Sequence, residues 1–299
     1  MIIALTGGTG FVGSRVIEAA LARNHRVRAL TRRPQADRDR LTWVEGALDD
    51  PASLRTLIGP ADTVLHVAGV VNAPDRDGFA AGNVEGSQAM VHAARDAGVQ
   101  RFVHVSSLAA REPTLSDYGW SKAEAEHVVA ASSLDWTMVR PPAVYGPGDM
   151  DMHGMFRAAK FGLAFLPPPG RTSLIHVDDL AGLLLALAVR KTPREIYEVD
   201  DGTGGWSYNT FAHMIGTAVG RKVVALSLSP GAMRFGAKID RLMRRDKARL
   251  TPDRVAYLCH PDWTIDSAKR PPRYLWEPKI ATPKGLVDTA RWYRDNRLL

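Results

Sequence analysis

The chain has 299 residues, of which 45% are hydrophobic and 24% are charged, so it can bury a substantial core and its composition excludes a disordered chain. The longest strongly apolar run, Leu180 to Val189, is too short to cross a bilayer, and we expect no membrane span. The single cysteine, Cys259, excludes an intrachain disulfide and favours the cytoplasm. The first residues have no basic region or cleavage-type segment, so we expect no secretory signal.

The balance of charge is basic, with a net charge of +7 and an isoelectric point near 9.7. Because most of the basic residues are spread along the chain and mixed with acids, we expect no nucleic-acid partner. One local cluster is formed by Arg241, Arg244, Arg245, Lys247 and Arg249. It fits a solvated helix face best, and it also fits a rim that attracts an anionic substrate or a contact with anionic lipid.

Strand-like and helical runs alternate through the first half of the chain. In chain order, we expect strands at 2–6, 26–31, 63–67, 102–106 and 136–140, with helices at 13–23 and 86–97. This alternation predicts an α/β fold with a Rossmann-type, doubly wound parallel sheet. We place a dinucleotide-binding domain at 1–148 and a smaller, mostly substrate-binding lobe at 149–299, with strand-like runs at 174–177 and 196–199 returning to the first domain.

A glycine-rich loop directly follows the first expected strand and opens the first helix. It reads Thr6-Gly7-Gly8-Thr9-Gly10-Phe11-Val12-Gly13. Glycine permits a tight turn and a close approach of backbone N–H groups to a pyrophosphate, and the helix N-terminus adds unsatisfied donors. We therefore expect this loop to bind a dinucleotide through Gly7, Thr9, Gly10, Phe11, Val12 and Gly13.

The end of the second expected strand indicates which nicotinamide cofactor is used. An acidic residue there would bond the adenosine ribose of NAD, but the strand ends in Thr31-Arg32-Arg33. A guanidinium pairs with a 2′-phosphate through charge-assisted, bidentate hydrogen bonds. The sequence thus predicts NADP(H), with Arg32 as the main partner of the phosphate and Arg33 as the second.

Tyr118 and Lys122 have the spacing Y-x-x-x-K, which puts both side chains on one face of a helix. A tyrosine, with an ordinary pKa near 10, is a poor acid or base at neutral pH, and a neighbouring ammonium favours its phenolate. Such a tyrosine can exchange a proton with a carbonyl or alcohol oxygen while a nicotinamide exchanges hydride with the carbon. The spacing alone also fits a solvated helix face, but its position after a strand that ends in Ser106-Ser107 favours catalysis.

Together, the threonine-led G-x-x-G-x-x-G loop, the paired serines and the Y-x-x-x-K spacing resemble the short-chain dehydrogenase/reductase family, particularly its extended, epimerase/dehydratase-like branch. The segments at 83–86, 140–148 and 175–181 also resemble that branch, so the likeness covers nearly the whole chain. The resemblance implies that Ser107 bonds the substrate oxygen, with Ser106 secondary, and that Lys122 bonds the nicotinamide ribose. It further implies a homodimer.

The resemblance also implies cofactor contacts elsewhere in the chain: Val67, Ala68 and Gly69 after the fourth strand, and Pro141, Ala143 and Val144 beside the nicotinamide. One position departs from the family pattern, because Ala47 stands where an aspartate often meets the adenine amine. This departure leaves two alternatives open: backbone groups near Leu48 hold the adenine, or Asp49 replaces the missing aspartate.

These features predict an oxidoreductase that interconverts a carbonyl and an alcohol on a small, apolar substrate. The apolar residues that suggest such a ligand, or else the core of the lobe, are Met150, Met152, Met155, Phe156, Phe161 and Phe165. Two alternatives stay open: a nucleotide-sugar epimerase or dehydratase that retains its cofactor, with Arg171 and Arg241 meeting a diphosphate, and a non-catalytic NADP(H)-binding regulatory protein. The histidines and Cys259 show no metal-ligand spacing, so we expect no metal.

Overall fold

The computed structural model describes residues 1–244 and 250–299 and divides into two compact units. Unit 1 comprises Met1–Pro141, Leu180–Glu198 and Lys269–Trp276, and unit 2 comprises Pro142–Asp179, Val199–Ala268 and Glu277–Leu299. Of the basic cluster expected near 241–249, Arg245, Lys247 and Arg249 lie outside the described residues, as does the side chain of Arg244.

Unit 1 is built on a seven-stranded parallel sheet. Its strands are β1 (Ile2–Thr6), β2 (Arg26–Thr31), β3 (Leu41–Glu45), β4 (Thr63–His66), β5 (Arg101–Val105), β6 (Asp135–Arg140) and β11 (Ile196–Glu198). They lie in the order β11-β6-β5-β4-β1-β2-β3. The order reverses between β1 and β4, which is where open α/β sheets bind ligands at the strands' carboxyl ends. The Rossmann-type, doubly wound fold expected from the sequence is therefore confirmed.

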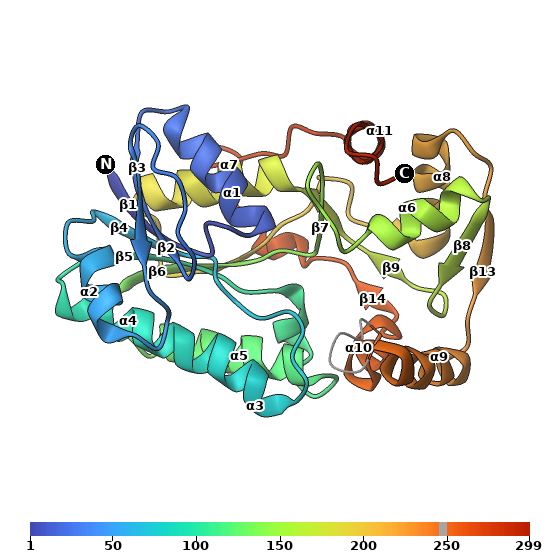
Figure 1. The fold of residues 1–299 in the computed structure, drawn as a ribbon, viewed down its shortest axis with the longest axis horizontal. Helices are drawn as coiled ribbons and strands as arrows, with labels where there is room; N and C mark the ends of the chain where they lie inside the picture. Colours follow the sequence, from blue (N-terminus) through green and yellow to red (C-terminus); the bar gives the residue numbers. More distant parts are fainter. Residues whose placement is uncertain (245–249) are drawn as a thin grey trace. The chain divides into compact units, whose positions relative to one another are not determined.

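Helices cover both faces of this sheet (Figure 1). One face carries α1 (Phe11–Leu21) and α7 (Val177–Val189), and the other carries α2 (Pro51–Ile58), α4 (Gly86–Asp96) and α5 (Asp117–Ala130). The helix α4 ends just before Gly98, which has a φ of +74°, the left-handed conformation that closes many helices. Short helical segments complete unit 1: α3 (Arg76–Phe79), η1 (Ala80–Glu85) and η2 (Leu108–Arg111), while η4 (Ser267–Lys269) spans the boundary between the units.

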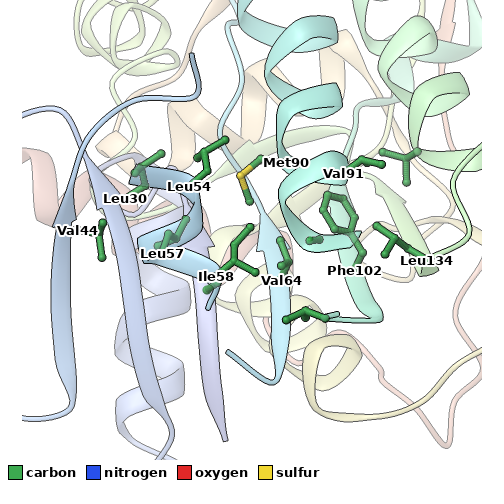
Figure 2. Close-up of a cluster of buried hydrophobic side chains, with 14 of the residues drawn as sticks. Leu30, Val44, Leu54, Leu57, Ile58, Val64, Met90, Val91, Phe102 and Leu134 are labelled. Atoms are coloured by element: carbon green, nitrogen blue, oxygen red, sulfur yellow. The ribbon is translucent and has the colours of Figure 1, made fainter. Parts of the chain in front are cut away.

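The core of unit 1 lies between the sheet and the helices α2 and α4. Figure 2 shows Val64 and Phe102 on the strands facing Leu57, Ile58 and other side chains of these helices. All four residues are buried. Fully burying one such side chain contributes roughly 1.5–3 kcal/mol, so this layer holds the carboxyl ends of the strands in fixed positions.

Unit 2 contains three small sheets and five further helices within the described residues. β7 (Ala143–Tyr145) pairs with β10 (Leu174–His176), β8 (Leu163–Leu166) pairs with β13 (Val224–Ser227), and β9 (Arg171–Thr172) lies between β12 (Trp206–Ser207) and β14 (Asp262–Trp263). The helices are α6 (His153–Lys160), α8 (Tyr208–Val219), α9 (Pro230–Arg244), α10 (Pro252–Leu258) and α11 (Thr282–Asp295). Phe156, Phe211 and Tyr293 form the centre of the core that α6, α8 and α11 share.

The two runs expected to return to the first domain behave differently. Ile196–Glu198 joins the sheet of unit 1 through β6, but Leu174–His176 pairs with β7 and belongs to unit 2. The expectation for 174–177 is therefore wrong. Both runs are short and apolar, and only their hydrogen-bonding partners distinguish them.

Candidate active site

The glycine-rich loop forms a tight turn between β1 and α1. Gly10 N–H donates to the Gly7 carbonyl at 3.0 Å, and Gly7 has a φ of +74°. A Cβ on Gly13 would lie 2.1 Å from the Gly7 oxygen, so only glycine permits this packing. No side chain caps the N-terminus of α1 and no acid lies in its first turn. The free backbone N–H groups at this end of α1 suit a pyrophosphate. They would donate hydrogen bonds to it, and the positive end of the helix dipole would stabilise its charge.

The residues expected around the adenosine follow β2 and β3, the strands on one side of β1 in the sheet. Arg32 and Arg33 are exposed directly after β2, where the Thr31 hydroxyl donates to the Arg33 carbonyl at 2.6 Å and orders the turn. Leu48 is half-buried and packs against Gly86, on which a Cβ would lie 2.7 Å from Leu48 Cδ1. Asp49 is exposed, whereas Asp50 caps α2 through the amide of Ala52.

The expected Tyr118–Lys122 pair lies in the first half of α5. Ser116 caps this helix by accepting a hydrogen bond from the Gly119 amide at 3.0 Å, which fixes the turn that carries Tyr118. A Cβ on Gly119 would lie 2.8 Å from the Ala109 carbonyl, so glycine lets the start of α5 pack against η2. Because Ser107 caps η2, this packing brings the serine segment and the tyrosine turn together.

Ser107 is buried, and its Oγ accepts a hydrogen bond from the Ala109 amide at 3.2 Å. A hydroxyl has one donor and two acceptor sites, so this bond leaves its hydrogen able to donate to a substrate oxygen. Ser106 instead donates to Glu126 Oε1 at 2.5 Å. The two neighbouring serines therefore have different environments: the Ser106 hydroxyl donates to Glu126, whereas the Ser107 hydroxyl accepts from a backbone amide.

Lys122 is a buried cation, with 4% of its surface exposed. Its Nζ donates to the Val105 carbonyl at 3.1 Å. Burial lowers the pKa of Lys122 to about 8, and the Coulombic attraction of Glu126 opposes part of that shift. The pKa of Lys122 therefore lies near neutral pH. Its Nζ is held at the carboxyl end of β5, where it can act on a phenol or on hydroxyl groups.

A buried chain of hydrogen bonds holds the loop that contains Val67, Ala68 and Gly69. Asn83 accepts from the Val70 amide at 2.7 Å and donates to the Val70 carbonyl and to Ser121 Oγ, both at 2.9 Å. A Cβ on Gly69 would lie 2.9 Å from Asn83 Oδ1 and 3.0 Å from Lys122 Nζ. Asn83 therefore joins this loop to α5, and Gly69 lets the loop pack closely against Asn83 and Lys122.

Two histidines lie beneath this loop, and sequence reasoning assigned them no role. His66 is fully buried and contacts Thr6 Oγ1 at 2.7 Å and Ser87 Oγ at 3.2 Å. Burial, assisted by Lys122, lowers the pKa of His66 to about 3. His104 stacks on His66 with ring centroids 5.4 Å apart, and its pKa is also lowered by burial. Both rings are therefore neutral and supply no counter-charge to Lys122.

Sequence reasoning also missed a buried network of charges behind Ser106. Arg140 donates to both carboxylate oxygens of Glu126, at 2.8 and 2.6 Å, and to Glu198 at 3.3 Å. Arg111, at the end of η2, pairs with Glu198 at 3.3 Å. Glu126 lies one turn beyond Lys122 on α5, so a spacing of four residues was the signal available in the sequence. The network ties α5, η2, β6 and β11 together.

The remaining expected residues divide between the two units. Pro141 is the last residue of the first segment of unit 1, and its carbonyl accepts a hydrogen bond from the Leu108 amide at 3.0 Å. Ala143 and Val144 belong to unit 2, where they pair with Leu174 and Ile175. Of the apolar residues expected to line a pocket or form the lobe core, Phe156 is core, Met152 and Met155 pack against it, and Phe161 and Phe165 are exposed.

Comparison with known proteins agrees with this arrangement. The model of the NAD dependent epimerase/dehydratase family matches residues 3–200. The chain is 35% identical to the ceramide reductase of Caulobacter vibrioides over 304 residues, covering 98% of this chain and 94% of that protein. It is 28% identical to sterol demethylase protein B of Methylococcus capsulatus, covering 100% of both. The fold resembles the Bordetella bronchiseptica enzyme WbmG in complex with NAD and UDP, with a TM-score of 0.76 and 20% identity over 99% and 96% of the two chains.

The chain belongs to the NAD dependent epimerase/dehydratase family, the extended branch of the short-chain dehydrogenases/reductases. It is an oxidoreductase or epimerase of that family, and a nicotinamide dinucleotide is its cofactor. The uncapped N-terminus of α1 fits the pyrophosphate of such a cofactor.

Proposed function

We propose that this chain is an NADP(H)-dependent reductase that interconverts a ketone and an alcohol on an apolar, lipid-like substrate. The observation that carries the choice of NADP(H) is the end of β2, where two exposed arginines occupy the place at which an acid would meet the ribose of NAD. The full-length similarity to a ceramide reductase supports a lipid-like substrate.

The residues would divide the reaction among them. When bound, the nicotinamide supplies hydride to the carbonyl carbon. Ser107 donates a hydrogen bond to the carbonyl oxygen, and Tyr118 gives that oxygen a proton as its negative charge develops. Lys122 would hold the ribose of the cofactor through its hydroxyl groups, and its positive charge would favour the phenolate form of Tyr118. One ketone, one proton and one NADPH yield one alcohol and one NADP⁺.

The proposed reaction is tested by NADPH oxidation with long-chain and short-chain ketones. We expect turnover of the long-chain compounds, and we expect Tyr118→Phe to lower kcat roughly 10²–10⁴-fold because the phenol is the general acid. Tyr274→Phe is the matched control, since that tyrosine is exposed in the same unit. Both variants must bind NADPH as the wild type does. Equal turnover by Tyr118→Phe would refute the assignment of the acid.

The cofactor choice is tested separately by binding. We expect Arg32→Ala to weaken NADPH binding roughly 10–100-fold, because it removes a charge-assisted bond to the 2′-phosphate, and to leave NADH binding nearly unchanged. Arg23→Ala, an exposed arginine just beyond α1, is the control. Equal losses for the two cofactors would contradict the assignment.

A second candidate function is supported by a different relative. The chain is 27% identical to a UDP-glucose 4-epimerase of Vibrio cholerae over 232 residues, which cover 67% of this chain and 70% of that protein. An epimerase or dehydratase would retain its cofactor through purification. Tightly bound NAD in the purified chain, with no net oxidation of added NADPH, would favour this candidate. Tight NADPH binding without any turnover would favour a non-catalytic regulatory protein.

A further inference from the structure

The helix α9 of unit 2 exposes a stripe of large apolar side chains. Phe235, Ile239, Leu242 and Met243 have exposed fractions of 65%, 43%, 82% and 78%. Their positions at i, i+4, i+7 and i+8 place them on one face of the helix. The opposite face, with Met233 and Ala237, is buried against α10. The packing of α9 in unit 2 is therefore made mainly by its other face.

A basic stripe runs beside the apolar one. Arg234, Lys238 and Arg241 are exposed and are spaced at i, i+4 and i+7, so they line one flank of the apolar face. The acid of the described helix, Asp240, is half-buried and accepts a hydrogen bond from the Leu250 amide at 2.9 Å. Over the part of α9 whose side chains are described, the exposed ionised groups are all positive.

The small sheet that precedes α9 has an apolar outer face as well. Leu163 pairs with Val224 and Phe165 pairs with Leu226, and all four side chains are exposed. The alternate residues of β8, Ala164 and Leu166, are buried in unit 2. Only residues 228–229 separate β13 from α9, so the two apolar surfaces follow one another along the chain.

We propose that α9, together with the outer face of the β8–β13 sheet, docks this protein onto the surface of a bilayer containing anionic lipid. An apolar stripe with a basic flank is the pattern of helices that lie in a membrane interface. A second copy of the chain fits less well, because two such faces would bring their basic stripes together. Nucleic acid fits less well too, because it offers no apolar surface to four large side chains.

The docking surface is separate from the catalytic and cofactor-binding residues of the proposed reaction. Phe165 and Arg241, considered for substrate binding from the sequence, are exposed on this surface. No helix in the described part of the chain is long and apolar enough to cross a membrane. The inferred attachment is therefore to the surface of the bilayer, with apolar side chains reaching the boundary between headgroups and acyl chains.

The proposal is tested by sedimenting the full chain with vesicles of phosphatidylcholine alone and of phosphatidylcholine with phosphatidylglycerol. We expect binding to the anionic vesicles that weakens as salt is raised. Each Lys or Arg near such a surface strengthens binding roughly fivefold, so the triple variant Arg234→Gln, Lys238→Gln, Arg241→Gln should bind roughly 100-fold more weakly. The control triple variant replaces the exposed Arg23, Arg55 and Arg95 of unit 1 by glutamine.

The apolar contribution is tested by Phe235→Ser with Leu242→Ser, and separately by Phe165→Ser with Leu226→Ser. We expect each pair to weaken vesicle binding at least roughly tenfold, because two large side chains no longer leave water on binding. Unchanged NADPH binding and melting temperature show that each variant is folded. The proposal is overturned if the wild type ignores anionic vesicles, if the control triple variant loses as much binding as the α9 triple variant, or if both serine pairs bind like the wild type. It is also overturned if Phe235→Ser with Leu242→Ser abolishes a dimer seen in sedimentation velocity while vesicle binding is absent.

Discussion

Replacing Lys122 by methionine is expected to change how the stability of the chain depends on pH. The pKa of Lys122 falls from its ordinary 10.5 to about 8 on folding, chiefly because of burial. Folding therefore disfavours the protonated form, and the free energy of unfolding rises with pH between the two values. Below pH 8 both states are protonated and the cost of the buried charge is present in full.

The size of this effect follows from the shift. One pKa unit corresponds to about 1.4 kcal/mol, so the buried charge costs about 3 kcal/mol near pH 7 and about 1 kcal/mol near pH 9.5. The wild type should thus gain about 2 kcal/mol over this range relative to Lys122→Met. Burial raises the pKa of Tyr208 to about 12, so above its ordinary pKa near 10 this tyrosine would ionise more readily in the unfolded chain and lower the free energy of unfolding. The comparison is therefore made below that pH.

Urea denaturation of the wild type and of Lys122→Met at the two pH values measures the difference. In the difference between the two proteins, the contributions of the other titrating groups to the pH dependence cancel. Lys284→Met, at an exposed lysine of α11, is the matched control. Equal pH dependence in the wild type and Lys122→Met would refute the reasoning, because it would mean that the ammonium pays no penalty for burial. We also expect Lys122→Met to lose activity, because the variant lacks the ammonium that supports Tyr118. A gain in stability with a loss of activity is common when a catalytic residue is replaced.

Two further predictions follow from close packing and from the buried charge network. Gly13→Ala places a Cβ 2.1 Å from the Gly7 oxygen, so we expect it to abolish detectable NADPH binding in a fluorescence titration, while Ser14→Ala, at an exposed neighbour, binds normally. Glu126→Ala leaves Arg140 without its bidentate partner, and breaking such a buried pair costs about 3–5 kcal/mol. Calorimetry should show a melting temperature lower by several degrees. A loss no greater than that of Glu124→Ala, at a half-buried site on the same helix, would contradict the role of the network.

Local pattern in the sequence determined the start of the fold. The glycine loop, the strand before it and the helix after it are fixed by residues that are neighbours in the chain, and β1 lies where it was expected at Ile2–Thr6. The alternation of apolar strands with helices predicted the parallel sheet for the same reason. The edge strand β3 (Leu41–Glu45) was not predicted, because exposed Thr42 and Glu45 interrupt its apolar residues. Its hydrogen bonds to β2, which the sequence pattern does not show, stabilise it as a strand.

The candidate site was predictable only in part. The spacing of Tyr118 and Lys122 indicates a shared helix face, but nothing in that spacing says that Lys122 is buried beside two neutral histidines. The same holds for Glu126, Arg140 and Glu198, which come from α5, β6 and β11 and meet only because the sheet sets those elements side by side. Burial and long-range pairing depend on which elements pack together, so the tertiary structure alone decided the pKa of Lys122, the different environments of Ser106 and Ser107, and the outward apolar face of α9.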